Sequence, residues 1–373
     1  MLFCLSVGIK INIFLILLPV NYLRLLLFPF SILYGLIVRV RNLLFDWKLL
    51  KQQQFDVPII AVGNLSVGGT GKTPHIEYLI RILKDSCSIA SLSRGYGRKT
   101  KGFLLANDEH DFKDIGDEPS QFHHKFKDLT VAVDENRCRG ISQLLELENK
   151  PDVILLDDAF QHRYVKPGLT ILLTDFHKIY TEDYLLPTGT LREPVSGARR
   201  ADVIIVTKTP RIFSPLLKRY LEEKLQVTDH QKLYFSYIKY GDLLPFSKAA
   251  LPIQSFNFKS ILLFSGIANT YPLENYCKKH CEDLLNINFA DHYQYKISDI
   301  ESIKRQYEEL RGTNKVIITT EKDAMRLFEP EIKLLLDDIP VYYLPIEVAL
   351  HDNAEEEFEQ TILNYVGKVT RNS

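Results

Sequence analysis

A glycine-rich segment early in the chain ends in a lysine and a threonine that could bind a phosphate group. It spans residues 63–74, and Lys72 and Thr73 directly follow its last glycine. Glycines let backbone N–H groups turn toward phosphate oxygens, and the N-terminus of a following helix adds partial positive charge. Lys72 would reach the β- and γ-phosphates of a nucleotide, and Thr73 would hold Mg²⁺. The expected nucleotide contacts are Asn64, Ser66, Gly68, Gly69, Thr70, Gly71, Lys72 and Thr73.

The residues on either side of this segment favour the same interpretation. Residues 57–62 form an apolar run that predicts a strand, and residues 75–83 carry apolar side chains at helical spacing. Strand, glycine-rich loop, Gly-Lys-Thr and helix is the arrangement that cradles phosphate. Ser66 stands where the motif usually has its first glycine, so the loop is a variant. An ordinary glycine-rich turn is the alternative, but Gly-Lys-Thr between such flanks seldom arises by chance.

Two adjacent aspartates follow another apolar run. Residues 152–156 predict a buried strand that ends in Asp157 and Asp158, where a carboxylate can hold Mg²⁺ directly or through water. Gln161 and His162 follow at once, and a loop above the sheet would place them beside the metal. Acidic strand ends are common and a lone histidine is usually structural, so the signal depends on the glycine-rich segment upstream. The expected metal ligands are Thr73, Asp157, Asp158 and Glu118.

Other charged residues could serve a reacting phosphate. Asp117 and Glu118 are bracketed by a glycine and a proline, which predicts a stiff loop, although composition alone favours a solvated acidic turn. Arg192 lies in a second turn-rich segment, residues 187–194. A single arginine is more often a surface charge. The candidates for neutralising phosphoryl charge are Arg94, Arg98, Arg137 and Arg192.

Two groups that contain histidine are ambiguous. Asp291 precedes His292, and a carboxylate can hold an imidazole in one tautomer for proton transfer, although a structural role is preferred for the pair alone. Cys277, His280 and Cys281 are close enough to suggest a metal site. Without a second ligand cluster, a helix that carries small side chains is the preferred interpretation.

The composition is that of an ordinary folded protein. A chain of 373 residues is too long for one core, so two domains are expected. Apolar content of 46% and charged content of 25% exclude global disorder. A net charge of −1 offers no general attraction to nucleic acid, and no nucleic-acid partner is expected. Five scattered cysteines argue against a disulfide framework and fit a reducing cytoplasm.

Alternating apolar strands and helices predict an α/β fold. We expect a P-loop NTPase-like parallel sheet with helices on both faces, a second smaller α/β domain and an N-terminal apolar membrane-anchor helix. The expected domains are an anchor segment (1–40), a P-loop core (41–210) and a second α/β domain (211–373) that completes an interdomain cleft. Further strands are expected at 87–93, 129–133, 169–173, 203–206, 260–264 and 315–318, and helices at 136–148, 272–284 and 298–311.

The N-terminal region is apolar but broken. Residues 11–40 are interrupted by prolines and polar residues, whereas a clean spanning helix needs about 20 uninterrupted apolar residues. A secretory signal would need a cleavage site of small residues, and the segment does not contain one. Two interpretations remain: a membrane anchor, spanning or lying in the interface, which is favoured, or a helical hairpin packed on the core. The basic residues that follow keep the downstream chain in the cytoplasm by the positive-inside bias; they are Arg39, Arg41, Lys48 and Lys51.

Taken together, the motifs resemble those of tetraacyldisaccharide 4'-kinase, the lipid A pathway kinase of Gram-negative inner membranes. The resemblance runs from about residue 18 to residue 350, and the ordered set is far more specific than any member except the glycine-rich loop. Ala159 stands where the family commonly has glycine, and Tyr293 where it often has a second histidine. The segments that carry the resemblance are residues 63–74, 93–98, 116–119, 157–162, 186–194, 266–269, 289–292 and 319–323.

The resemblance implies a reaction and its partners. ATP with Mg²⁺ would donate its γ-phosphoryl group to the 4'-hydroxyl of an acylated glucosamine disaccharide 1-phosphate lipid, giving lipid IVA. It implies that Asp117 acts as the base, assisted by His292 from the other domain, with Lys72 and Arg192 also catalytic. A monomer at the cytoplasmic face of the bacterial inner membrane is expected. The alternatives are a membrane-associated P-loop ATPase switch or assembly factor, and a binding protein with an idle loop. The expected substrate-binding residues are Tyr96, Arg98, Arg137, Gln161 and His162.

Overall fold

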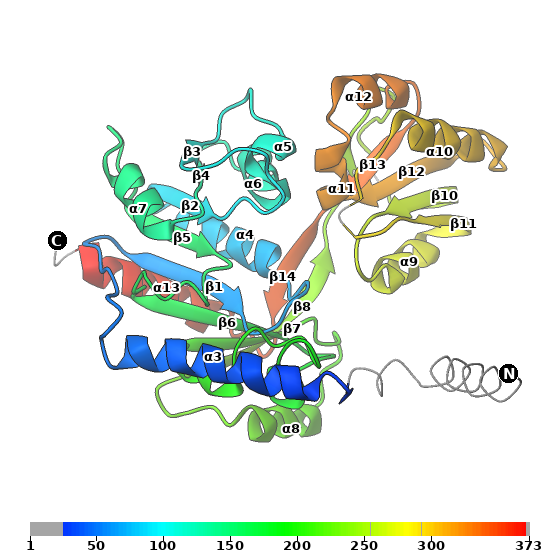
Figure 1. Ribbon diagram of the computed structural model, residues 1–373. Coiled ribbons are helices and arrows are strands. Elements are labelled where there is room, and N and C mark those ends of the chain that lie inside the picture. Colours follow the sequence, from blue (N-terminus) through cyan, green and yellow to red (C-terminus); the bar gives the residue numbers. More distant parts are fainter. Residues whose placement is uncertain (1–24, 254, 292, 371–373) are drawn as a thin grey trace, which may run out of the picture. The chain divides into compact units, whose positions relative to one another are not determined.

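The computed structural model describes residues 25–253, 255–291 and 293–370 (Figure 1). Its residues form two compact units. The first unit comprises the described residues up to Phe55, together with Ala61–Gly71 and Asp158–Phe235. The second comprises Asp56–Ile60, Lys72–Asp157 and the described residues from Ser236 onward. Because the strands β1 and β8 are divided between the units, each unit is assembled from several stretches of sequence.

The larger sheet has nine strands, most of them parallel. Pairing is parallel between β6, β7 and β8 and between β5, β2 and β4, whereas β14 and β3 are antiparallel to their neighbours. Four of the strands are buried throughout, as parallel strands covered on both faces must be. In spatial order the strands are β14 (Ile346–Leu350), β8 (Lys232–Tyr240), β7 (Val203–Thr207), β6 (Leu169–Asp175), β1 (Ile59–Asn64), β5 (Val153–Asp157), β2 (Ile89–Ser93), β4 (Thr130–Val133) and β3 (Leu104–Leu105).

The first unit packs its helices around β6 and β7. Its core includes Leu172 and Ile204 from these strands, Leu221 from α8 (Pro215–Leu225) and Leu191 from the segment that precedes the 3-10 turn η2 (Val195–Arg200). Ser214 caps α8 by accepting a hydrogen bond from the N–H of Leu217. The long helix α3 (Phe28–Asp46), blue in Figure 1, also belongs to this unit. Among the described residues it is the only helix long and apolar enough to cross a membrane.

The second unit includes the helices that accompany β2, β4 and β5. The helix α4 (Lys72–Leu83) buries Ile76, Leu79, Ile80 and Leu83, which lie on one face at helical spacing. An aspartate caps α5 through a capping box, and an asparagine caps α7 by accepting an N–H. The other helices are α5 (Phe112–Ile115), α6 (Asp117–Lys125), α7 (Arg137–Leu145) and α13 (Glu355–Thr370).

A second, smaller sheet of five strands lies within the same unit. Along β10, Leu262 and Phe264 pack against one set of helices, while Ile261 and Leu263 pack against α9 on the other face. In order the strands are β11 (Cys281–Asn288), β10 (Phe258–Ser265), β12 (Lys315–Thr320), β13 (Val341–Leu344) and β9 (Leu244–Pro245). The helices are α9 (Tyr271–Cys277), α10 (Ile297–Glu309), α11 (Glu321–Arg326) and α12 (Pro330–Leu336).

Three local predictions were wrong. The helix expected at 272–284 ends at Cys277, and residues 281–288 form β11, whose backbone pairs in parallel with β10. Residues 117 and 118 were expected in a loop, but they form the first turn of α6. The single helix preferred for Cys277, His280 and Cys281 does not form: Cys277 ends α9, His280 ends the 3-10 turn η3 (Lys278–His280), and Cys281 begins β11.

Candidate active site

In the first unit, the glycine-rich loop is held by side chains from neighbouring strands. The Asn64 amide at the end of β1 donates to the Thr70 hydroxyl over 2.8 Å, and the Thr207 hydroxyl donates to the Thr70 carbonyl over 2.9 Å. Gly68 and Gly71 have φ angles of 117° and 83°, which side-chain-bearing residues rarely adopt. The loop therefore has a defined path that needs glycine at these positions.

A second segment, residues 190–192, runs alongside the loop. The Arg192 N–H donates to the Leu65 carbonyl over 2.7 Å, and the Val67 N–H donates to the Thr190 carbonyl over 2.8 Å. Ser66 forms an antiparallel bridge with Leu191. A β-bridge is extended backbone that any residue adopts, which explains why serine is accommodated where the motif usually has glycine.

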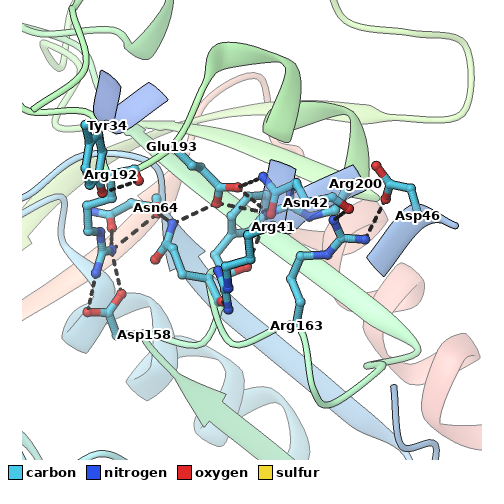
Figure 2. A network of polar contacts seen from close by, with 12 residues as sticks. Tyr34, Arg41, Asn42, Asp46, Asn64, Asp158, Arg163, Arg192, Glu193 and Arg200 are labelled. Carbon is cyan, nitrogen blue, oxygen red and sulfur yellow. Dashed lines mark hydrogen bonds and ion pairs between the residues drawn. The ribbon is translucent and has the colours of Figure 1, made fainter. Parts of the chain in front are cut away.

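The Arg192 side chain joins the strand ends of the first unit (Figure 2). Its guanidinium donates to both carboxylate oxygens of Asp158 over 3.2 and 2.7 Å and also contacts the side-chain oxygen of Asn64. Asp158 has a φ of 47°, a left-handed conformation that costs of order 1 kcal/mol or more outside glycine. This turn directs the Asp158 carboxylate to Arg192. Asn64, Asp158 and Arg192, all predicted site residues, are thus brought together.

Next to Arg192, the buried Glu193 is a centre of polar contacts that the sequence did not reveal (Figure 2). Its carboxylate accepts hydrogen bonds from Arg200 over 2.9 and 3.0 Å and from the Gln161 amide over 2.9 Å. The same Gln161 amide donates to the Asn64 carbonyl over 2.8 Å. Gln161, expected to bind substrate, therefore also holds the end of β1. The Arg-Glu-Pro sequence was the only signal for Glu193, and nothing marked Arg200.

In the second unit, Lys72 and Thr73 begin α4, where the helix N-terminus supports anion binding. Asp157 ends β5 and is 7% exposed. Arg137 is buried, and its guanidinium donates to the carbonyls of Asp134 and Asp157 over 2.8 and 3.2 Å. This arginine, expected to bind substrate, thus secures the chain where β5 ends.

The other predicted substrate residues have varied surroundings. The Arg98 guanidinium donates to the Gly102 carbonyl over 2.7 Å and to the Glu135 carboxylate over 2.8 Å. Tyr96 is 77% exposed. In the first unit, the His162 ring lies 5.9 Å from the Tyr164 ring. Arg98 therefore stabilises its own loop, whereas Tyr96 presents its ring to solvent.

Asp117 and Glu118 lie in the first turn of α6, where the helix dipole favours negative charge. The buried Arg326 contacts both Asp117 oxygens, one of them over 3.3 Å from its Nε, and reaches Asp323 over 3.3 Å. Burial is the largest influence and lowers the pKa of Arg326, but the hydrogen bond to Asp117 and the charges of Asp117 and Asp323 together outweigh burial and raise the pKa above its usual value. The predicted partner of Asp117, His292, lies outside the described residues.

Residues 23–366 match the family model described as tetraacyldisaccharide-1-P 4'-kinase. The chain belongs to this family. It is 46% identical over 360 residues to the tetraacyldisaccharide 4'-kinase of Bacteroides thetaiotaomicron, covering 93% of this chain and 94% of the relative. It is 50% identical over 359 residues to that of Parabacteroides distasonis, covering 93% and 96%.

A solved structure supports the same assignment. The crystal structure of LpxK from Aquifex aeolicus in complex with ATP is similar with a TM-score of 0.72 and 30% identity, covering 92% of this chain and 99% of that one. The 4'-kinase family, the α/β fold and the kinase class expected from the motifs are therefore confirmed.

Proposed function

We propose that this chain transfers the γ-phosphoryl group of ATP to the 4'-hydroxyl of a tetraacylated disaccharide 1-phosphate lipid, forming lipid IVA. The observation that carries the proposal is the glycine-rich loop, with Arg192 linked to Asn64 at its start and to Asp158. Phosphoryl transfer needs mainly positioning and charge neutralisation, and this group supplies both. The family membership supports the choice of acceptor.

The donor side is assigned to the loop and the residues that follow it. Lys72 at the start of α4 would hold the β- and γ-phosphates, and Arg192 would neutralise developing charge. Thr73, Asp157, Asp158 and Glu118 offer hard oxygen ligands, which is the chemistry that Mg²⁺ prefers. Held by these residues, Mg²⁺ would supply positive charge that neutralises the phosphate oxygens.

The acceptor hydroxyl needs a group to take its proton. We assign this role to Asp117, assisted by His292. The cationic Arg326 favours the ionised carboxylate, which is the form of Asp117 that accepts a proton. Tyr96, Arg98, Arg137, Gln161 and His162 stay predicted substrate contacts, and the domain boundaries at residues 40 and 210 also stay predictions.

We propose that α3 attaches the enzyme to the cytoplasmic face of the inner membrane by lying in the interface. Its outward face exposes large apolar side chains, including Leu33, Leu36, Ile37 and Val40. Its opposite face packs on the first unit through Ser31 and Gly35. A helix with one apolar face and one docked face suits the membrane surface. An acceptor with four acyl chains stays in that bilayer, and a monomer suffices to reach it.

The direct test is incubation of the purified chain with γ-labelled ATP, Mg²⁺ and the tetraacylated disaccharide 1-phosphate in mixed micelles. Label is expected on the lipid, at the 4' position, and Lys72→Ala should abolish it. ATP hydrolysis without labelled lipid would favour the ATPase switch instead. If neither labelled lipid nor ATP hydrolysis is detected, the result would favour the binding protein with an idle loop.

A further inference from the structure

The inward face of α3 is fitted to one segment of the first unit. The Ser31 hydroxyl donates to the Thr188 hydroxyl over 2.7 Å and accepts the Thr188 N–H over 3.0 Å. A Cβ at Gly35 would stand 2.6 Å from a Leu185 methyl group, closer than real Cβ contacts come. These contacts fix the position of α3 against residues 185–188.

The same face of α3 continues to the residues beside the glycine-rich loop (Figure 2). The Tyr34 hydroxyl donates to the Arg192 carbonyl over 2.7 Å, and the Asn42 amide donates to the Glu193 carboxylate over 3.2 Å. Arg41 donates to the Gln161 carbonyl over 3.0 Å. Burial, followed by the Glu193 charge, raises the pKa of Tyr34, so the hydroxyl stays protonated and can donate.

The residues that receive these bonds also hold the nucleotide loop. Arg192 binds Leu65 through its backbone and Asn64 and Asp158 through its side chain, and Gln161 binds the Asn64 carbonyl. Glu193 is 2% exposed, and a buried carboxylate is costly unless its partners stay in place. Arg192, Glu193 and Gln161 therefore form a single layer of residues between α3 and the glycine-rich loop.

We propose that α3 is a positioning element for phosphoryl transfer as well as an anchor: Tyr34 and Asn42 hold Arg192 and Glu193, so a lipid surface bound to the outer face of α3 aligns Arg192 with Asp158 and Asn64. This inference rests on the proposed function. Misplacing a catalytic group by about 1 Å can cost about 10²-fold in rate, so modest movement of α3 is sufficient. Tyr34 and Asn42 act through Arg192 and Glu193 and need not touch substrate.

The first test separates the two faces of α3 by kinetics. Tyr34→Phe and Asn42→Ala are each expected to lower kcat by about 10-fold or more at saturating ATP and lipid, with unchanged sedimentation on vesicles of phosphatidylethanolamine and phosphatidylglycerol. Leu36→Ser and Ile37→Ser, at side chains 58% and 61% exposed, should instead weaken vesicle binding and raise the lipid KM. Tyr220→Phe removes a hydroxyl from α8, outside the network, and serves as the matched control.

The second readout does not need the lipid to be phosphorylated. Trp47, the only tryptophan, follows α3 and is 66% exposed, so its fluorescence reports vesicle binding. Vesicles should tighten ATP binding, and ATP should tighten vesicle binding by the same factor. Tyr34→Phe should reduce both. If wild-type protein shows this coupling but labels no lipid, the proposed function fails, whereas the link from α3 to the nucleotide loop stands. If kcat and coupling in Tyr34→Phe and Asn42→Ala match those of Tyr220→Phe, the inference is overturned.

Discussion

The guanidinium of Arg326 contacts both carboxylate oxygens of Asp117, a residue 209 positions earlier in the chain. Arg326 ends α11 and Asp117 begins α6, so this ion pair fastens two helix termini together. The Arg326 side chain is 1% exposed and also contacts Asp323. The proposed base is therefore oriented by a buried cation.

Replacing Arg326 with methionine is expected to lower the free energy of unfolding by about 3–5 kcal/mol, because Asp117 and Asp323 lose their common cation. Urea unfolding measures the change. Arg305→Met, at an exposed position on α10, should change stability by no more than about 0.5 kcal/mol. The double variant with Asp117→Asn should lose less than the two single losses added together. Equal losses at Arg326 and Arg305 would contradict the buried ion pair.

Asp117→Ala should lower turnover by roughly 10²–10⁴-fold, the usual contribution of a general base. ATP binding should persist, because Asp117 lies on α6 and not in the glycine-rich loop. Steady-state kinetics and nucleotide titration measure the two effects. Near-full turnover in Asp117→Ala would remove this residue from the proposed role.

Asp158→Ala and Arg192→Lys test the cluster beside the loop. The first should abolish transfer by damaging the proposed Mg–ATP site. A lysine ammonium cannot reproduce the paired contacts of the Arg192 guanidinium with Asp158 and Asn64, so Arg192→Lys should lower kcat despite its unchanged charge. Arg199→Lys, on the exposed side of η2, is the control. Wild-type kcat in Arg192→Lys would show that charge alone suffices.

The buried Glu321 predicts a pH-dependent stability. Its carboxylate lies 2.7 Å from the Lys125 ammonium, which also binds Glu77 over 2.8 Å. Burial, followed by the Glu77 charge, raises the pKa of Glu321 above 4.5. Between the unfolded and folded pKa values the folded chain keeps a proton that the unfolded chain has lost, so this contribution to stability is present at low pH and is lost as pH rises through the folded pKa.

Glu321→Gln keeps the uncharged form at every pH. Its free energy of unfolding, relative to wild type, should therefore rise as the pH increases above about 4.5, the ordinary glutamate pKa. Denaturant titrations across this range measure it, with Glu331→Gln on the exposed side of α12 as the control. If this difference stays constant or falls as the pH rises, the Lys125 charge offsets burial and the Glu77 charge, and the pKa of Glu321 is not raised.

Local patterns predicted much of the fold and the donor loop. Residues 57–83 contain strand, loop and helix in one continuous stretch, and β1 and α4 appear there. The start of α6 was also readable, because an acidic first turn with a proline is a helix N-terminal signal that the loop interpretation overlooked. Glu193, Arg200 and Arg326 were missed because each depends on a partner that only the tertiary fold brings near.

The close packing of Gly35 against Leu185 also limits the distance between the outer surface of α3 and the proposed active site. Only the width of α3, about 10 Å for a helix with its side chains, separates the outer apolar surface from the Arg192 backbone that Tyr34 contacts. A sugar headgroup could therefore reach Arg192 while its hydrocarbon tails remain dissolved in the leaflet. The enzyme would not have to extract the lipid acceptor from the membrane. Turnover would therefore avoid the large free-energy cost of exposing four acyl chains to water.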